Sequence, residues 1–444
     1  MRLVNTKIKL CMFLPYQCTA LEEYLEGMAS KGWLLKSIKN NYYIFKKCEP
    51  KKLKYSIDFF DKLSIFDKKN SRVALEYREY CEVAGWRYVC ESGKLQVFCS
   101  DKNKEPIAIQ TDETEKFKVV RKTSIYALGF QLINVLLFIF ILLMQWIFQV
   151  PEFILTNNIG IFSSLVMFIF ILINLTTIIH FIIWSIMAKR KLKTNNKLIY
   201  SNYKQLIIKN IFQKAYCIIS LVGLIWFCII EDSNMSGGLS IGFIIGIALC
   251  ILVDMLAQRW IDKKNYSRET NIFIRIGGMA LATIVMIMII NVSVIHSVFS
   301  GAYNNQQEAK AKNPSLTLMD FGFNKNDKDE YKRYNKSILA SRELYWLNNG
   351  VYSLDTTIFE SKYGVITRFY GDRLVEWLNS IRFDYKLQES KLPKNIKVYY
   401  CNDKKNNEDR FVLVSDNKVV ELRKGFDTIS NDEFLNKVYE KVLK

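Results

Sequence analysis

The stretch Glu23–Lys47, EYLEGMASKGWLLKSIKNNYYIFKK, is repeated in outline at Glu76–Ser100, EYREYCEVAGWRYVCESGKLQVFCS. At an offset of 53 positions a Glu-Tyr pair, a second glutamate, a Gly-Trp pair and a distant phenylalanine all coincide. A single unit of about 30 residues buries too little surface to fold alone, so the two copies are expected to share one core. The repeat therefore predicts the fold of the first quarter of the chain.

Each copy reads as a helix followed by a β-hairpin. An acidic amphipathic segment ends at Gly32 or Gly85, and glycine suits the left-handed position that follows a helix. Trp33 and Trp86 then open strands, and a short polar turn leads to a second strand in each copy. A further alternating segment, KLKYSIDFF, lies between the copies.

These patterns predict an α+β domain over residues 1–120 with the order α-β-β-β-α-β-β. We expect an antiparallel sheet with both helices on one face. The residues expected at equivalent helix-to-strand corners, as structural anchors, are Gly32, Trp33, Gly85 and Trp86.

Apolar residues are concentrated in the middle of the 444-residue chain, between about residues 125 and 299, whereas the flanking segments are as charged as ordinary soluble domains. The formal net charge is +19, and much of the excess lies beside the apolar segments, where attraction to anionic lipid accounts for it. Membrane lipid is therefore an expected partner, and no nucleic acid is expected.

Five segments are long and apolar enough to span a bilayer. They lie at residues 126–149, 159–187, 211–230, 238–257 and 276–299. We predict a transmembrane region of five helices over residues 121–300.

The loops between these segments alternate in charge. Lys116, Lys118, Arg121 and Lys122 precede the first span, the loop 150–158 has no lysine or arginine, and the loop 188–210 has seven. The turn 231–237 is acidic and the loop 258–270 is basic. Basic loops remain in the cytoplasm, so we expect a multi-pass protein of the plasma membrane with a cytoplasmic N-terminus and an extracytoplasmic C-terminal domain over residues 301–444.

Few polar residues lie within the predicted spans. Asp254 is an acid near the cytoplasmic end of the fourth span, where it can reach water or Arg259, so the structural role is favoured over a functional one. A stripe of small residues, Gly238, Gly242 and Gly246, forms a helix-packing face. Packing within one subunit is favoured, and homo-oligomerisation is the alternative.

The sequence contains no recognisable catalytic or metal-binding motif. The two histidines both lie in apolar segments, the N-terminal domain has none, and no Walker loop, nucleophile elbow or zinc-protease helix is present. Ten cysteines include no C-x-x-C pair and are expected to be free thiols. We expect no catalytic, cofactor-binding or metal-binding residues, no cofactor, and a non-enzymatic protein.

The last 145 residues predict a small α+β domain behind a polar linker. Helices are expected at 328–349, 372–381 and 431–443, and strands at 351–359, 364–370, 396–400, 410–414 and 418–423. The expected core residues are Trp346, Phe359, Phe369, Trp377 and Val412.

Four motifs in the N-terminal domain carry a family resemblance. MASKGW at residues 28–33 is followed by F-K-K-x-E-P-K-K at 45–52, Y-x-I-D at 55–58 and AGW at 84–86. Over about residues 8–105 the chain resembles the bacterial family of domain of unknown function 2812. The resemblance implies a domain joined to membrane spans and genes that lie beside PadR-type regulators, with no established activity.

The expected function is that of a regulatory or signal-transducing membrane protein, in which the duplicated domain engages a cytosolic or membrane protein partner. The alternative is an accessory subunit or small transporter in envelope stress tolerance. A membrane-bound hydrolase would require a catalytic cleft for which the sequence offers no residues.

Overall fold

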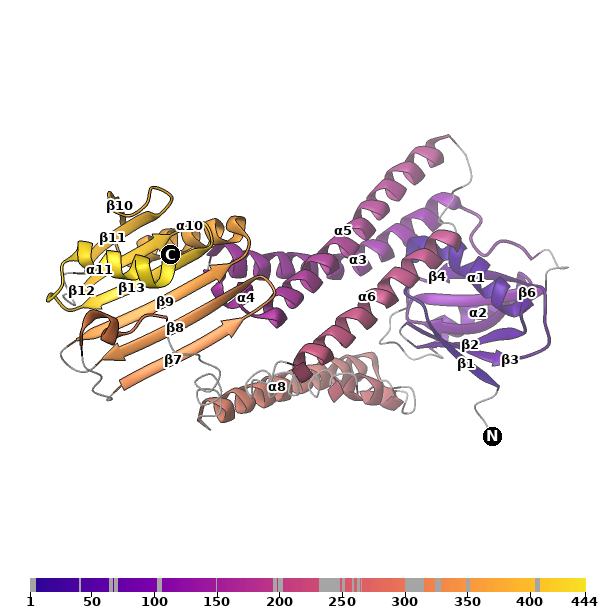
Figure 1. Ribbon diagram of the computed structural model, residues 1–444. Coiled ribbons are helices and arrows are strands. Elements are labelled where there is room, and N and C mark those ends of the chain that lie inside the picture. The colour runs from indigo at the N-terminus through magenta and orange to yellow at the C-terminus, as the bar shows by residue number, and fades with distance from the viewer. Residues whose placement is uncertain are drawn as a thin grey trace. The chain divides into compact units, whose positions relative to one another are not determined.

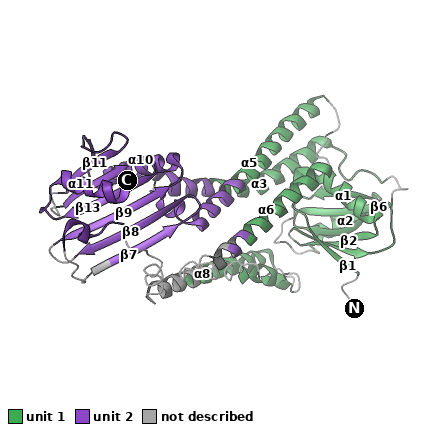
Figure 2. Cartoon of the chain, in the orientation of Figure 1, with its two compact units in different colours: residues 1–136, 170–222, 242–290 green, residues 137–169, 223–241, 291–444 purple. Residues whose placement is uncertain are grey.

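The computed structural model divides into two compact units (Figure 2). The first comprises residues 1–136, 170–222 and 242–290, and the second comprises 137–169, 223–241 and 291–444. The structure describes residues 5–39, 41–63, 67, 71–101, 106–148, 150–194, 198, 203–230, 248–249, 252–257, 259–261, 264, 266–299, 315–323, 329–348, 352–403 and 408–444.

The N-terminal domain of the first unit contains two three-stranded antiparallel sheets (Figure 1). The first has the order β1-β3-β2 and the second β4-β6-β5. The elements are β1 (Thr6–Leu10), α1 (Cys18–Ser30), β2 (Trp33–Lys39), β3 (Tyr42–Lys47), β4 (Leu53–Phe59), α2 (Arg72–Val83), β5 (Arg87–Ser92) and β6 (Leu95–Asp101), with a short helical turn at Pro15–Gln17.

The prediction of the helices and hairpins is confirmed, but the prediction of one sheet without β1 is wrong. Each half of the domain is a β-α-β-β unit, because β4, which lies between the two sequence copies, is the first strand of the second half. Its counterpart β1 is only five residues long, TKIKL, and its alternation of lysines with Ile8 and Leu10 is a strand signal that the prediction did not use.

The two hairpins have the same register at an offset of 53 positions. Leu35 lies opposite Phe45 and Tyr88 lies opposite Phe98, and each ladder then shifts by one residue, between Leu35 and Ser37 and between Tyr88 and Cys90. The left-handed conformation predicted for Gly32 and Gly85 is also found, with φ of +77° and +91°.

One core joins the two halves of the domain. Fully buried side chains of both sheets, such as Phe45, Ile57 and Val97, belong to it. Helix α1 packs along β4, where Glu22 and Glu26 accept the backbone N–H groups of Ile57 (2.8 Å) and Tyr55 (3.2 Å). These carboxylates occupy donors of an edge strand that would otherwise be open to pairing with another chain.

Three stretches of the described chain are helical and are long and apolar enough to cross a membrane: Glu113–Phe148, Asn158–Lys193 and Tyr203–Gly223. They correspond to α3 (Glu113–Leu143) with the π-helical turn Met144–Phe148, to α5 (Asn158–Lys193) and to part of α6 (Tyr203–Ile230). Side chains such as Leu136 and Phe140 are exposed, as expected of a surface that meets lipid.

The other two predicted spans are less fully described. Helix α8 (Arg268–Phe299) contains the predicted fifth span. The predicted fourth span, at 238–257, lies mostly outside the described residues, and so do Gly238, Gly242 and Gly246.

The C-terminal domain of the second unit is built on one seven-stranded antiparallel sheet of order β10-β11-β12-β13-β9-β8-β7 (Figure 1). Helix α10 packs on one face and α11 on the other, so the domain has two cores. The elements are α4 (Glu152–Leu155), a helical turn at Leu318–Phe321, β7 (Asp329–Lys336), β8 (Ala340–Asn348), β9 (Ser353–Ser361), α10 (Gly364–Ile381), β10 (Lys386–Gln388), β11 (Lys397–Asp403), β12 (Glu408–Val414), β13 (Lys418–Gly425), α11 (Asn431–Val438) and a π-helical turn at Tyr439–Leu443.

The predicted helix at 328–349 is instead the hairpin of β7 and β8. Ser337 builds the turn, since its backbone N–H donates to Ala340 O at 2.8 Å and its hydroxyl accepts the N–H groups of Leu339 and Ala340. Such side-chain to backbone bonds compete with a helix, and burial of alternate residues such as Tyr345 and Leu347 favours the strand.

The predicted strand at 364–370 is instead the first half of α10. Thr367, Tyr370, Gly371 and Leu374 are buried at helical spacing. A Cβ at Gly371 would lie 2.9 Å from Val414 Cγ2, so this glycine permits close packing of helix and sheet and does not end the helix.

The predicted core is confirmed at Phe359 and Val412, which are fully buried. It is wrong at Trp346, Phe369 and Trp377, which are 37%, 38% and 39% exposed. Trp377 lines a cavity, and Phe369 belongs to the part of α10 that was taken for a strand.

Candidate ligand-binding cavity

The sheet face beneath α10 has an apolar part and a charged part. Phe359, Val412 and Val419 pack against Tyr370 and Leu374 of α10. Further along the same strands, residues of the same alternation are charged and line a cavity of about 580 Å³. The lining residues are Val150, Glu152, Phe153, Arg342, Leu344, Asp355, Thr357, Leu374, Trp377, Leu378, Ile381, Phe383, Arg410, Glu421 and Arg423.

One wall of the cavity comes from the loop between the first two candidate spans. Glu152, at the start of α4, forms an ion pair with Arg342 at 3.2 Å and accepts a hydrogen bond from the hydroxyl of Tyr370 at 3.1 Å. Tyr370 is fully buried and stacks on Phe359, with ring centroids 4.0 Å apart. Burial raises the pKa of Tyr370 well above its usual range, so this residue remains a neutral donor.

Leu155 anchors the same loop in the α10 core. Its carbonyl accepts the hydroxyl of Ser337, and Asn158 Oδ1 accepts the backbone N–H of Ile338 at 3.0 Å. The turn between β7 and β8 therefore holds the C-terminal end of α4 and the start of α5. The sequence suggested only a loop without lysine or arginine, whereas the structure makes it part of the C-terminal domain.

The three arginines of the cavity are already paired with carboxylates. Arg342 pairs with Glu152, and Arg423 Nη1 lies 3.1 Å from Asp355 Oδ2. Arg410 Nη2 lies 2.9 Å from Glu408 Oε2 and 3.3 Å from Asp403 Oδ2, and its guanidinium stacks over the Phe383 ring.

Glu421 differs from the other acids of the cavity. It lies on β13 between Val412 of β12 and Thr357 of β9. Among the residues that the structure describes, it has no hydrogen bond and no ion pair. Burial raises the pKa of the Glu421 carboxyl, an effect that Asp355 and Glu152 reinforce and that Arg423 and Arg342 oppose.

The cavity thus combines a charged floor with an apolar roof. Leu374, Trp377, Leu378 and Ile381 of α10 supply the roof, and the strands supply the floor. Its volume lies in the range of small-molecule sites, which are mostly apolar with a few polar groups that orient the ligand. Within the described part of the chain, no group of three or more His, Cys, Asp or Glu side chains could hold a metal ion.

We expect Glu152→Gln to lower the free energy of opening of the C-terminal domain by about 2 kcal/mol, because the nearly buried Arg342 would lose its charge partner. Hydrogen exchange of peptides from β8 and α10 in the full-length protein measures this change. Glu376→Gln is the matched control, since Glu376 is 65% exposed in its pair with Arg373, and its effect should stay within about 0.5 kcal/mol. Equal effects of the two changes would contradict the anchoring role of Glu152.

Asp254 has an ion-pair partner, but not the arginine expected from the sequence. Its Oδ1 lies 3.4 Å from Arg275 Nε of α8, and both side chains are only 23% exposed. Nearby, a Cβ at Gly278 would lie 3.3 Å from Val253 Cγ1, and Ala282 is buried. These contacts indicate helix packing within the first unit.

The four repeat anchors have unequal surroundings. Trp86 is buried and donates from its indole nitrogen to Ile107 O at 2.7 Å, whereas Trp33 is partly buried with Lys7 Nζ 4.9 Å above its ring. A Cβ at Gly32 would lie 2.7 Å from the carbonyl oxygen of Cys48, while a Cβ at Gly85 would meet only Pro106, at 3.4 Å.

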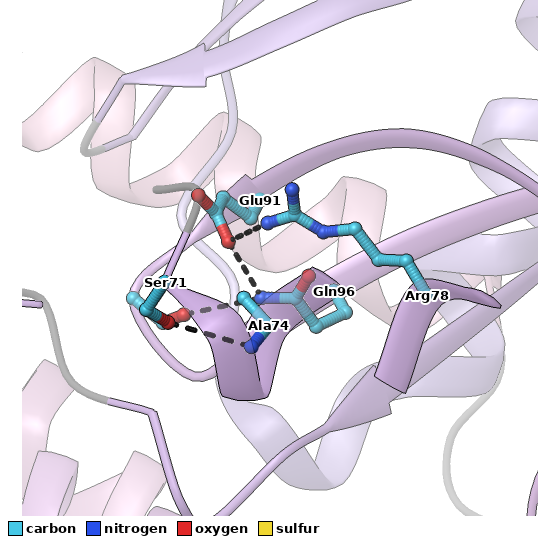
Figure 3. A network of polar contacts seen from close by, with 6 residues as sticks. Ser71, Ala74, Arg78, Glu91 and Gln96 are labelled. Atoms are coloured by element: carbon cyan, nitrogen blue, oxygen red, sulfur yellow. Dashed lines mark hydrogen bonds and ion pairs between the residues drawn. The ribbon is translucent and has the colours of Figure 1, made fainter. Parts of the chain in front are cut away.

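A polar network distinguishes the second copy from the first (Figure 3). Arg78 Nη2 lies 2.5 Å from Glu91 Oε2, which also accepts Gln96 Nε2 at 3.0 Å. The side chains of Arg78 and Glu91 are each 9% exposed, and the guanidinium stacks on Tyr88. At an offset of 53 the first copy has Leu25, Ile38 and Tyr43, all three buried.

The eight cysteines whose side chains the structure describes are free, in agreement with the expectation of unpaired thiols at these positions: Cys11, Cys18, Cys48, Cys81, Cys90, Cys99, Cys217 and Cys401. Burial raises the pKa of Cys18 and Cys90 to about 12. These thiols are therefore protonated fillers of the core.

The sequence reasoning did not identify the cavity residues. One signal was present: in KVVELRKG, Glu421 and Arg423 alternate onto the same strand face as Val419. Charged residues that share a face with core residues mark a sheet surface that is only partly covered.

Comparison with known families matches residues 18–132 to a family model described as protein of unknown function (DUF2812). The match extends beyond the predicted limit at residue 105 and into α3. No curated protein and no solved structure matches the chain.

Proposed function

Residues 18–132 belong to the DUF2812 family, and from this premise we propose that the protein is a non-enzymatic membrane protein of the regulatory or signal-transducing type. It links an extracytoplasmic domain, residues 301–444, to a cytoplasmic domain, residues 1–120, that binds a cytosolic or membrane protein partner. The single observation that carries the proposal is that helices α3 and α5 each contribute to both compact units.

In the first unit these helices enter the core of the N-terminal domain. Phe117 and Val120 of α3 and Trp184 of α5 are buried in it. Tyr16 lies against Trp184, with ring centroids 5.4 Å apart, so the chain segment before α1 is held by a candidate membrane helix.

In the second unit the segment between the same two helices forms the wall of the cavity. Glu152 and Leu155 bind to β8 and to the α10 core, as described above. A change in the cavity that moves α4 would therefore act on the ends of both helices. Because an α-helix resists bending, such a displacement reaches residues further along it.

The proposed topology has five spans, with the N-terminus in the cytoplasm and the C-terminus outside. It is supported by the basic loops and by the division of the chain, since the unit boundaries after residues 136, 169, 222 and 290 each lie inside a predicted span. A phosphatase that is active only outside the cytoplasm, fused after Lys444, should be active in cells. An inactive fusion, with an active one after residue 120, would contradict this orientation.

The proposed link is tested by crosslinking in cells. A photoreactive amino acid at Val83, which is exposed on α2, should capture a cytosolic or membrane protein. Glu152→Gln should change the yield at least twofold, and Glu376→Gln should not. Failure to capture a partner at Val83 and Tyr80, or a yield that Glu152→Gln leaves unchanged, would contradict the proposal.

The alternative, a small transporter or accessory subunit in envelope stress tolerance, depended on Asp254. Its pairing with Arg275 favours a structural role in helix packing over a role in transport. Loss of a solute flux in vesicles with Asp254→Asn would restore it.

A further inference from the structure

We propose that the cavity of the C-terminal domain binds a small cationic amphiphile, an ammonium or guanidinium group on an apolar body, and that Glu421 is its charge partner. This inference rests on the proposed function, since it names the class of signal that the extracytoplasmic domain would detect.

Among the charged residues of the cavity floor, one acid is not part of an ion pair. Arg342, Arg410 and Arg423 are each within 3.3 Å of a carboxylate oxygen. Glu152 and Asp355 are the cavity acids in two of these pairs. Glu421 has no hydrogen bond and no ion pair in the described part of the chain, and only the longer-range charges of Arg423 and Arg342 favour its ionised form. A buried carboxylate without a partner is unfavourable, and an opposite charge brought beside it restores the balance.

The roof offers a site for an apolar body. Leu374, Trp377, Leu378 and Ile381 follow the i, i+3, i+4, i+7 spacing of a single helix face. Leu374 and Leu378 are buried against the sheet, whereas Trp377 and Ile381 are 39% and 53% exposed and leave apolar surface for a ligand. Phe153 of α4 and Phe383 complete the apolar surroundings.

The same arrangement disfavours an anionic ligand. An anion would meet Glu421 at close range, and the Nη groups of Arg342 and Arg423 already pair with Glu152 and Asp355. Among the buried arginine nitrogens of the cavity that the structure describes, only the Nε groups of Arg342 and Arg410 lack an acceptor. A cation beside Glu421 meets an acid that has no ion pair among the described residues. The position of Glu421 between Thr357 and Val412 places the charged group of the ligand at the floor and its body under α10.

Three probes that share a phenyl group and a four-carbon chain but differ in the polar end group test the assignment: 4-phenylbutylamine, 4-phenylbutyrate and 4-phenylbutanol. Binding to the full-length protein in lipid nanodiscs is measured by calorimetry, with empty nanodiscs subtracted. We expect the amine to bind at least tenfold more tightly than the carboxylate and the alcohol. Glu421→Gln should remove this preference while leaving the affinity for the alcohol unchanged.

Glu360→Gln is the matched control, because Glu360 is an exposed glutamate on the neighbouring strand β9; it should leave the amine affinity unchanged. Tighter binding of the carboxylate, an amine preference that survives Glu421→Gln, or no binding of any probe would each overturn the assignment.

The outcome is separable from that of the proposed function. If the amine binds through Glu421 but does not alter crosslinking at Val83, the ligand assignment stands and the proposed link fails. If no probe binds while Glu152→Gln still changes the crosslinking yield, the link stands and the ligand assignment fails.

Discussion

Arg78→Leu is expected to lower the free energy of opening of the N-terminal domain by about 3–5 kcal/mol, the usual cost of removing one member of a buried ion pair. The loss arises mainly from Glu91, which would remain buried with Gln96 as its neighbour but without a positive charge. Hydrogen exchange of peptides from α2, β5 and β6 in the full-length protein measures this loss.

The triple change Arg78→Leu/Glu91→Ile/Gln96→Tyr is expected to recover most of that stability. It transplants the residues that the first copy has at the same positions, where Leu25, Ile38 and Tyr43 pack in a buried group. Replacing a whole buried ion pair by well-packed apolar residues is often neutral or stabilising. A triple variant as unstable as the single one would show that the two copies do not share an environment here.

The exposed pair Arg72–Glu76, on the same helix, provides the control. Arg72→Leu should change the opening free energy by no more than about 0.5 kcal/mol, because an exposed i, i+4 pair contributes little. A comparable loss with Arg72→Leu would mean that α2 tolerates no change of charge, and that burial does not explain the effect at Arg78.

Gly32→Ala is expected to cost about 3 kcal/mol in the same domain. An L-residue in the left-handed conformation costs about 1–2 kcal/mol, and the new Cβ would lie 2.7 Å from the backbone oxygen of Cys48. That backbone cannot yield easily, because Cys48 N donates to Gly32 O at 2.9 Å and Lys51 N donates to Ala29 O at 3.1 Å.

Two other glycines of this domain give a graded comparison. Gly85→Ala should cost only the conformational term, about 1–2 kcal/mol, since Pro106 lies at contact distance, 3.4 Å from the Cβ position. Gly27→Ala should stabilise α1 by about 0.5–1 kcal/mol, because Gly27 is inside the helix and its Cβ would meet nothing within 4 Å. Unfolding of the three variants by hydrogen exchange of α1–β3 and α2–β6 should follow this order, and equal effects at Gly32 and Gly27 would contradict it.

The resemblance to the family and the helix–hairpin pattern of the N-terminal domain were readable from the sequence because local signals agreed there. A glycine cap, a following tryptophan and alternating strands each predict the same element, and each occurs twice. The C-terminal domain lacked such agreement. The segment 328–349 has helical composition, yet the turn at Ser337 and burial of alternate side chains make it a hairpin.

The cavity could not be predicted for a different reason. Glu152, Arg342 and Tyr370 are separated by up to 218 positions, and no local pattern relates them. The sequence did not predict a role for Glu421, because a glutamate on an alternating strand is expected to face water. Only the positions of α10 and α4 show that this strand face is enclosed.

The sequence by itself determined the apolar helices, the free thiols and the repeated unit with its glycine caps, because hydropathy, spacing and backbone conformation depend on neighbours along the chain. Only the tertiary structure decided that each half is a β-α-β-β unit, that the loop at Glu152 belongs to the C-terminal domain, and that Glu421 has no partner among the described residues. These features depend on strand pairing and on charge pairing between distant segments, whose free energies are set by burial and distance in space.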